Sequence, residues 1–451
     1  MGLFRSTTST LSTYSKFSSI PKLPFSDIQS FPETLLKSPP RSLADLQYIY
    51  THSHPLYSAF LLVVWNSAWT WLASEITGNL SQVDRVWTFL PVMYTIHFTF
   101  QPLIAHYLSL ASDNRPPITL KNYEEIVSYI LAHTDHRQLL MLATQLFWSA
   151  RLSFNAYRRG FFHPNSEDYR WEVLRDKVPK FLLKIFNILF IAIAQNVLLL
   201  GIALPSYYLL VQSNPTLYSS ALSKKDAQAL KTNSGPTRAD WVLAGACVAC
   251  VIGEYLSDGI QQAYQSWKHT PDEKRAKTKT WTVLPFGLGP KSLSITWGET
   301  DLRRGFVSEG LWSYSRHPAF ALEQSFWLLQ GLFPLVHLSS SVPSGFRQLR
   351  NQIASSDRPG WELIAGSATS VPWWPFAGAL GLMSLFIAST LFTEYITSPK
   401  YPAYKRAYQR RVGMFWPLDT YLKRIWLSCT DGNFARRKLE TELGWSKTKR
   451  D

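Results

Sequence analysis

The chain has 451 residues, of which 46% are apolar, 14% are aromatic and 17% are charged. The charged fraction lies below the ~25% of soluble domains, and the aromatic content excludes disorder or a coiled coil for most of the chain. The net charge is +15, and because the basic residues are spread along the chain, no nucleic-acid partner is expected.

The apolar residues are concentrated in seven long runs. A run of about 20 residues spans the hydrocarbon core of a membrane, so the runs predict an all-α polytopic bundle of about seven transmembrane helices. The third and fifth runs are short, and buried helices of a soluble domain stay an alternative for them. The fourth contains Pro205, which suits a tilted or kinked span. The runs are 56–73, 86–108, 139–154, 181–211, 241–256, 318–338 and 373–396.

The positions of Lys and Arg between these runs predict the orientation of the bundle. Segments on one side of the membrane carry 30 of these residues, and segments on the other side carry 15. Positive charge favours the cytoplasmic side, so the carboxyl terminus is predicted in the cytosol and the amino terminus outside or in the lumen. Lys447 and Lys449, near the carboxyl terminus, resemble a dibasic retrieval signal, which favours the endoplasmic reticulum.

The two ends of the chain are predicted to lie outside the bundle. Residues 1–50 are expected to form a disordered or targeting tail, because the first 26 residues are rich in Ser and Thr and contain no acid. Residues 51–420 hold the predicted transmembrane domain, and residues 421–451 a basic cytosolic tail.

Metal chemistry is disfavoured by the cysteine and histidine patterns. Cys247 and Cys250 form a C-x-x-C inside an apolar run with no second pair, which favours helix packing. His133 and His136 form a single H-x-x-H, whereas a membrane di-iron site needs several histidine clusters. We therefore expect no metal site.

Polar side chains follow a helical spacing at the cytosolic end of the fifth run. Glu254, Asp258, Gln261 and Gln265 recur at steps of four, three and four, which places them on one face of a helix that leaves the membrane. Acids at membrane depth usually face a bundle interior or a wet cavity, so Glu254 and Asp258 are candidate site residues. A solvated helix end is the alternative.

The third run ends in a basic stripe. Arg151, Asn155 and Arg158 follow at steps of four and three residues, and Arg159 is adjacent. Arg170 follows in the segment "EDYRWEVLR". A snorkelling border of a membrane span would have the same composition. The stripe is thus either a ligand-binding surface or a membrane border.

A third motif, "GLWSYSRHP", runs directly into the sixth apolar run. Pro318 suits the first turn of a helix, which places Arg316 and His317 just before the partly positive helix end. Helix N-terminal amides together with Arg make an anion site. Glu323 follows inside the apolar run, where a carboxylate needs a partner.

After the seventh run, Tyr401, Tyr404 and Tyr408 form an aromatic stripe beside a basic one that reaches Arg411. An interfacial amphipathic helix would look much the same. The segment after the seventh run is therefore either part of a cofactor site or a helix on the membrane surface.

Taken in order, "ARLSFNAYRRGFF…EDYRWEVLR", "GLWSYSRHPAFALE" and "TEYITSPKYPAYKRAYQRRVGMFWP" resemble an uncharacterised integral-membrane family related to the steroid 5-alpha-reductases, over roughly residues 80–420. The R-H-P and the acid after it resemble the isoprenylcysteine carboxyl methyltransferases more distantly. The first resemblance implies a seven-helix bundle that takes NADPH from the cytosol and an apolar substrate from the bilayer.

The resemblance also implies roles for individual residues. Asp258, with Ser257 before it, is similar to a Ser-Asp pair set against the cofactor, and Tyr314, Arg316 and His317 fall in the cofactor-binding stretch. Steroid reductases use a Glu and a Tyr from their first half, and Tyr94 and His97 are the candidates for the catalytic acid here, with a packed aromatic and a core histidine as alternatives. The other residues expected at the cofactor are Asn155, Arg159, Arg170, Glu254, Glu323, Tyr404 and Arg411.

Three positions depart from the family pattern and put cofactor binding in doubt. Ala319 stands where the family has Asn, Leu322 where it has Gly, and Glu254 where steroid reductases have Asn. The chain therefore lacks an amide that could grip the nicotinamide, and carries a bulkier side chain where the backbone was expected to approach the ligand.

The expected function is an NADPH-dependent reductase of a hydrophobic enone or alkene, such as a steroid, sterol, isoprenoid or lipid. The alternatives are a methyltransferase using S-adenosylmethionine and a non-catalytic lipid-binding protein. NADPH is preferred because many guanidinium groups on the cytosolic side suit a polyanion. These are Arg151, Arg158, Arg159, Arg170, Arg303, Arg304, Arg316 and Arg411. The sequence leaves the substrate and the oligomeric state open.

Overall fold

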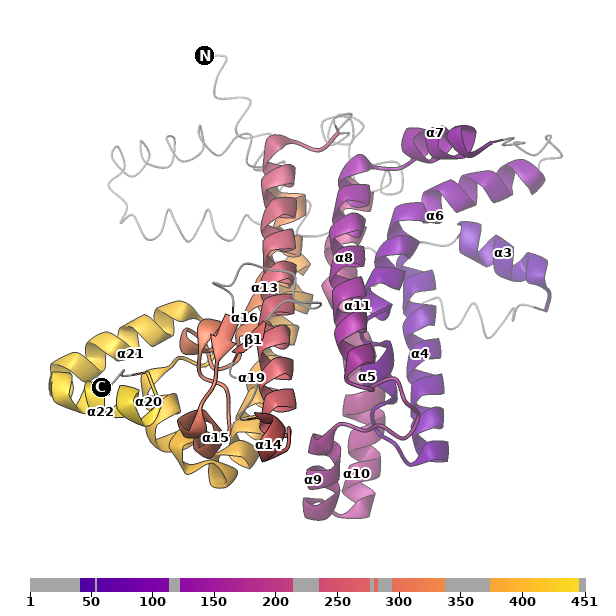
Figure 1. The fold of residues 1–451 in the computed structure, drawn as a ribbon. Coiled ribbons are helices and arrows are strands. Elements are labelled where there is room, and N and C mark those ends of the chain that lie inside the picture. Colours follow the sequence, from indigo (N-terminus) through magenta and orange to yellow (C-terminus); the bar gives the residue numbers. More distant parts are fainter. Residues whose placement is uncertain are drawn as a thin grey trace, which may run out of the picture. The chain divides into compact units, whose positions relative to one another are not determined.

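The computed structural model describes seven parts of the chain, and these parts are mostly helical (Figure 1). The chain divides into two compact units, the first made of residues 1–245 and 328–381 and the second of residues 246–327 and 382–451. The described residues are 41–52, 55–112, 122–213, 235–275, 280–282, 294–336 and 374–445. The predicted amino-terminal tail and the two lysines near the carboxyl terminus lie almost wholly outside them.

The first unit is built around α6 (Leu90–Ser112), which packs against α11 (Gln195–Ser213), α8 (His136–Arg158) and α3 (Leu43–His52). Side-chain caps begin two of its helices: Asp135 accepts hydrogen bonds from the first amides of α8, and Asn122 does so for α7. Its other elements are α4 (Pro55–Thr77), α5 (Gln82–Val86), α7 (Tyr123–His133), α9 (Tyr169–Lys177), α10 (Lys180–Phe186), η1 (Asn187–Ala194) and η7 (Trp374–Phe376).

Three helices contribute residues to both units, namely α13 (Arg238–Lys268), α16 (Pro318–Val336) and α19 (Ala377–Lys400). Within the first unit, α11 meets the start of α19 so closely that a Cβ on Gly378 would lie 2.1 Å from the carbonyl carbon of Gly201. A glycine on each helix is therefore what allows this contact.

Each predicted apolar run overlaps a helix in the part of the chain that the structure describes, and four helices there are long and apolar enough to cross a membrane. These four indicate a membrane protein. They comprise α4, the continuous stretch Lys180–Val211 in which α10, η1 and α11 follow without a break, α13 and α19. The count of seven stays a prediction, because α6, α8 and α16 are long enough but not apolar enough. In α8 the reason is visible, since Arg137, Gln145 and Arg151 are buried in it.

The second unit carries the remaining elements. A two-stranded antiparallel sheet pairs β1 with β2, in the register Thr280 to Thr296 and Thr282 to Ser294. The region predicted as a basic tail contains the end of α21 and α22, and both pack on the core of this unit. The elements are α14 (Asp272–Arg275), β1 (Thr280–Thr282), β2 (Ser294–Thr296), α15 (Glu299–Arg304), η5 (Gly310–Ser313), η8 (Tyr404–Tyr408), α20 (Gln409–Arg411), α21 (Pro417–Thr430) and α22 (Gly432–Glu442).

A buried ion pair joins three helices of the first unit. Arg137 of α8 and Asp240 of α13 are 1% and 0% exposed, and the guanidinium Nε and Nη2 lie 3.0 and 2.9 Å from Asp240 Oδ1. Arg137 also donates to the carbonyl of Phe333 in α16, and the Thr237 amide and hydroxyl donate to Asp240 Oδ2 at 2.8 and 2.7 Å. Neither charged residue was singled out by the sequence.

Candidate functional site

Four side chains of the second unit converge on the carboxylate of Glu394, near the end of α19. Arg316 binds it with two nitrogens, Nε to Oε1 at 2.7 Å and Nη2 to Oε2 at 3.2 Å. The Tyr404 hydroxyl donates to Oε1 at 3.1 Å, Gln409 Nε2 donates to Oε2 at 2.9 Å, and His317 Nε2 lies 3.0 Å from Oε1. These five residues, here termed the Glu394 cluster, use the carboxylate oxygens as common acceptors.

Backbone contacts hold the same motif in place. The amides of Arg316 and His317 donate to the carbonyls of Gly413 and Met414 at 2.9 and 3.1 Å. Arg316 Nη1 donates to the carbonyl of Val412. The guanidinium that was expected to meet a cofactor phosphate is thus engaged with protein acceptors, and Arg316 is 5% exposed.

His317 is the member of the cluster with a nitrogen left for a ligand. Because a carboxylate only accepts, Nε2 carries the hydrogen that it shares with Glu394, and Nδ1 is the acceptor of the neutral ring. Burial lowers the pKa of His317, so the neutral form is favoured. Within the described residues no group donates to Nδ1. The ring lies between Phe320 and Phe415, with centroids 5.9 and 6.3 Å away.

Tyr404 serves the cluster as a hydrogen-bond donor rather than as an acid. Burial, followed by the charge of Glu394, raises the pKa of Tyr404 well above its ordinary value. The phenol therefore keeps its hydrogen at neutral pH and stays bound to Glu394.

The polar stripe of α13 lies beside this motif. As predicted, Glu254, Asp258, Gln261 and Gln265 fall on one continuous helix, with Glu254 buried and Asp258 half-buried. Trp312 Nε1 of η5 lies 3.4 Å from the carbonyl of Ser257, at the long end of hydrogen-bond distances. The Ser-Asp pair is therefore next to the segment that leads into Tyr314 and His317. Tyr314 itself is exposed.

Leu322 fills the space between α13 and α16. A Cβ on Gly253 would lie 2.8 Å from Leu322 Cδ1, so the leucine occupies the place that the glycine of α13 leaves open. Glu323, the next residue, is buried in α16. The departure from the family pattern at position 322 is thus matched by a glycine on the facing helix.

Several arginines expected at a cofactor have protein partners instead. This reduces the number of guanidinium groups left to meet phosphate. Arg159 and Arg303 are exposed. The partners are Glu440 for Arg411 at 3.0 Å, Asp301 for Arg304 at 2.6 Å, Asp168 for Arg170 at 2.8 Å, and the Asn155 side chain for Arg158 at 3.0 Å.

The catalytic candidates Tyr94 and His97 lie on α6 in the first unit, and both contact α4. His97 Nε2 lies 2.8 Å from the Pro55 carbonyl and Nδ1 lies 3.2 Å from the Tyr50 hydroxyl, so both ring nitrogens have partners. Tyr94 differs, because Asn66 Nδ2 donates to its oxygen at 3.3 Å and leaves the phenolic hydrogen for another acceptor. Tyr94 is therefore the better candidate acid.

The predicted residues consequently divide between the units. The first unit holds Tyr94, His97, Asn155, Arg159 and Arg170. The second holds Glu254, Asp258, Tyr314, Arg316, His317, Glu323, Tyr404 and Arg411, and of these it brings Arg316, His317 and Tyr404 together on the carboxylate of Glu394. Glu394 and Gln409 belong to the segment that the sequence singled out after the seventh run, but neither was among the predicted site residues. The signal for Glu394 was present, since an acid inside an apolar run needs a partner.

Among the described residues there is no group of three or more His, Cys, Asp and Glu side chains that could hold a metal ion. Cys247 and Cys250 are both buried in α13. His136 Nε2 lies 2.9 Å from the carbonyl of Leu131.

Glu309, just before η5, predicts a pH-dependent stability. Burial, followed by the charge of Asp301, raises the pKa of Glu309 from about 4.5 to about 7. Between about pH 4.5 and 7 the folded protein therefore holds a proton on Glu309 that the unfolded chain has lost. This contribution to stability is full below about pH 4.5 and is lost as the pH rises through about 7.

We expect Glu309→Gln to remain more stable than the natural protein at pH 8 and to match it at pH 4.5. Thermal unfolding at both pH values measures this, with Glu299→Gln, at an exposed residue of α15, as control. Equal pH dependence in all three proteins would contradict it.

Comparisons with known proteins match a region of the chain that contains the Arg316-His317 motif. Residues 123–342 match a family model described as "Protein of unknown function (DUF1295)". The chain is 28% identical over 369 residues to "Uncharacterized protein C594.04c" of Schizosaccharomyces pombe, which covers 82% of this chain and 81% of the relative. No solved structure matches the chain. The family match includes His317 but ends before Glu394.

Proposed function

We propose that the protein is a membrane reductase that uses NADPH to reduce a hydrophobic enone or alkene of the steroid, sterol, isoprenoid or lipid class. Its proposed location is the endoplasmic reticulum, with the carboxyl terminus in the cytosol. The similarity of its motifs to the steroid 5-alpha-reductases supports this. The observation that carries it is the Glu394 cluster, which holds His317 in one orientation with Nδ1 available. Trp312, five residues before His317, contacts Ser257 of α13.

In such a reaction NADPH, when bound, supplies a hydride to the β carbon of the substrate. The residues of this chain then have three tasks. Glu394 and Arg316 fix the position of His317, and His317 Nδ1 accepts a hydrogen bond from an amide or hydroxyl of the ligand. Asp258, next to Ser257 on α13, keeps its predicted place near the cofactor as a proposal. Tyr94 of the first unit stays the predicted acid, because Asn66 leaves its phenolic hydrogen available for donation.

The fit to NADPH is uneven along the cofactor. His317 Nδ1 is an acceptor for the nicotinamide end, but few guanidinium groups remain for the phosphates. Arg303, which is exposed, is one of them in the second unit. This observation favours the alternative of S-adenosylmethionine, a ligand without phosphate, and hence a methyltransferase. The packing of Leu322 against Gly253 favours the other alternative, a non-catalytic lipid-binding protein.

Thermal unfolding with each ligand tests the proposal. We expect NADPH to stabilise the purified protein and S-adenosylmethionine not to do so, because a ligand bound only by the folded state raises its stability. His317→Gln removes the ring acceptor, so we expect it to weaken NADPH binding about tenfold, the equivalent of one hydrogen bond. Arg316 is unsuitable for this purpose, since its removal would strip Glu394 of its charge partner.

Asp431→Asn provides the matched control, because Asp431 is a partly exposed acid of the same unit and is paired only with Arg410 at the surface. Its NADPH affinity should equal that of the natural protein. Stabilisation by S-adenosylmethionine alone would overturn the proposal in favour of the methyltransferase, and stabilisation by neither ligand would overturn it in favour of the non-catalytic alternative.

A further inference from the structure

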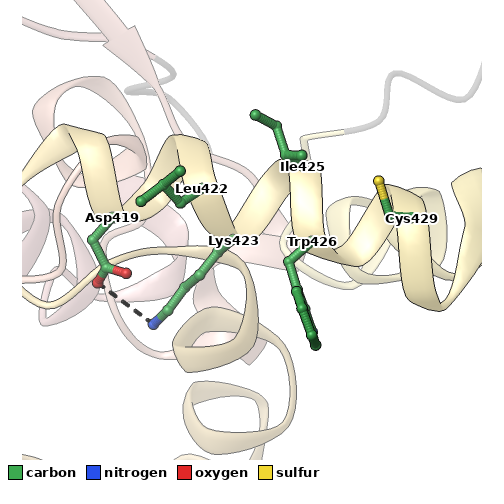
Figure 2. A pocket seen from close by; sticks show the side chains of 6 residues that line it. All are labelled: Asp419, Leu422, Lys423, Ile425, Trp426 and Cys429. Carbon is green, nitrogen blue, oxygen red and sulfur yellow. Dashed lines mark ion pairs between the residues drawn. The ribbon is translucent and has the colours of Figure 1, made fainter.

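One face of α21 is apolar and exposed. Its residues recur at helical spacing, so they share one side of the helix. Trp426 and Leu418 are 69% and 66% exposed. The face, here termed the α21 apolar face, consists of Leu418, Tyr421, Leu422, Ile425, Trp426 and Cys429. Figure 2 shows four of these side chains around an open depression on the helix.

The opposite side of α21 is anchored to the second unit. Leu427 is buried in a cluster with Phe306 and Tyr408. The Thr420 hydroxyl donates to the carbonyl of Tyr314 at 2.6 Å and accepts from the Gly413 amide at 2.7 Å. The apolar face is therefore held outward by the fold, and a rotation of the helix that buried it would break these contacts. A contiguous exposed apolar face on an anchored helix marks a binding surface.

The start of α21 lies level with the last turns of α19, a helix that can cross a membrane. His317 precedes α16 and binds Glu394 of α19 at 3.0 Å, and the His317 amide donates to Met414, three residues before α21. Figure 1 shows α21 running across the long direction of α13 rather than along it. The helix is thus fixed near the end of a membrane-crossing helix and does not extend parallel to it.

The residues on and beside the apolar face suit a membrane interface. Tyr421 and Trp426 are the aromatic types that concentrate at the level of lipid headgroups. Arg424 is exposed beside the face. Lys423, on the other flank, binds the carbonyls of Gln409 and Val412 at 3.1 and 3.2 Å and lies 3.7 Å from Asp419 Oδ2, so it holds the helix in place. Aromatic residues flanked by basic ones are the composition of a helix lying in the headgroup region.

We propose that α21 lies in the headgroup region of the membrane that α19 crosses, with the α21 apolar face against the upper acyl chains. The occupant of this face is lipid, because the contacts through His317 and Glu394 place the helix at the depth where the membrane ends. This inference is independent of the catalytic proposal.

Spin labels on the full chain in lipid nanodiscs holding one copy test the proposal. The native Cys429 lies on the apolar face, whereas Cys247 and Cys250 are buried, so Cys429 can be labelled directly. Leu422→Cys, made together with Cys429→Ser, gives a second position on the face. Arg424→Cys in the same background is the matched control on the flank. Oxygen concentrates in lipid and a nickel chelate in water, so their relaxation effects report the environment of each label.

We expect the oxygen-to-nickel ratio at Cys429 and at position 422 to exceed the ratio at position 424 several-fold. Equal ratios at all three positions, with high access to nickel, would place the face in water and overturn the proposal. Low access to both reagents at positions 422 and 429 would show that protein covers the face, and would overturn it as well. Because each disc holds one copy, a second copy of the chain cannot produce the expected result.

Discussion

Glu394→Ala is expected to lower the free energy of unfolding by about 3–5 kcal/mol, because it leaves the buried guanidinium of Arg316 without its counter-charge. Arg316 and Glu394 are 5% and 7% exposed, so water cannot replace the lost carboxylate. His317, Tyr404 and Gln409 lose their common acceptor in the same variant. Chemical or thermal unfolding of the purified protein in detergent measures the change.

Two further variants make this expectation specific. The double variant Arg316→Met with Glu394→Met should lose less stability than Glu394→Ala, because it buries no unpaired charge. Asp431→Asn, which breaks a surface pair with Arg410, should cost about 0–1 kcal/mol. If Glu394→Ala does not fold, Tyr404→Phe still removes a single hydrogen bond to Glu394 and should cost about 1 kcal/mol. A loss from Glu394→Ala no larger than that from Asp431→Asn would refute the central role of the cluster.

Asp240→Ala is expected to cost a similar amount, about 3–5 kcal/mol, in the first unit. The reason is again a stranded charge, since Arg137 is 1% exposed and binds Asp240 with two of its nitrogens. Asp240 also receives the amide and hydroxyl of Thr237, so the start of α13 loses two further bonds. The same unfolding measurement applies.

Thr237→Val separates these contributions, because it removes the hydroxyl but leaves the ion pair, and we expect a loss of only about 1 kcal/mol. The pair Arg137→Met with Asp240→Leu should recover part of the stability lost in Asp240→Ala. If the double variant were less stable than Asp240→Ala, the unpaired charge would not be the cause of the loss.

The internal pairing of the arginines changes how the net charge is interpreted. The sequence places many arginines on the predicted cytosolic side, and their number favours a polyanionic cofactor. In the structure Arg304, Arg316 and Arg411 each face a carboxylate of the second unit. The number of basic residues thus overstates the charge available to a ligand, because a guanidinium paired with a carboxylate presents little free charge.

Predictions about helices succeeded because they depend on local information. An apolar run of membrane length forms a helix wherever it lies, since every backbone group must be paired in lipid. A step of three or four residues fixes one helical face, which is why Glu254 and Asp258 were correctly placed on the same side of α13.

The sequence by itself therefore determined a helical membrane protein and the helix faces on which its polar residues lie. Only the tertiary structure decided which charges meet: Arg316 and Glu394 are 78 residues apart, and Arg137 and Asp240 are 103 apart. A buried charge must have a partner, but any of several distant acids can supply it, and the choice follows from how the helices pack. The outward orientation of the α21 apolar face was decided in the same way, because the contacts of Thr420 and Leu427 on the opposite side determine which face remains exposed.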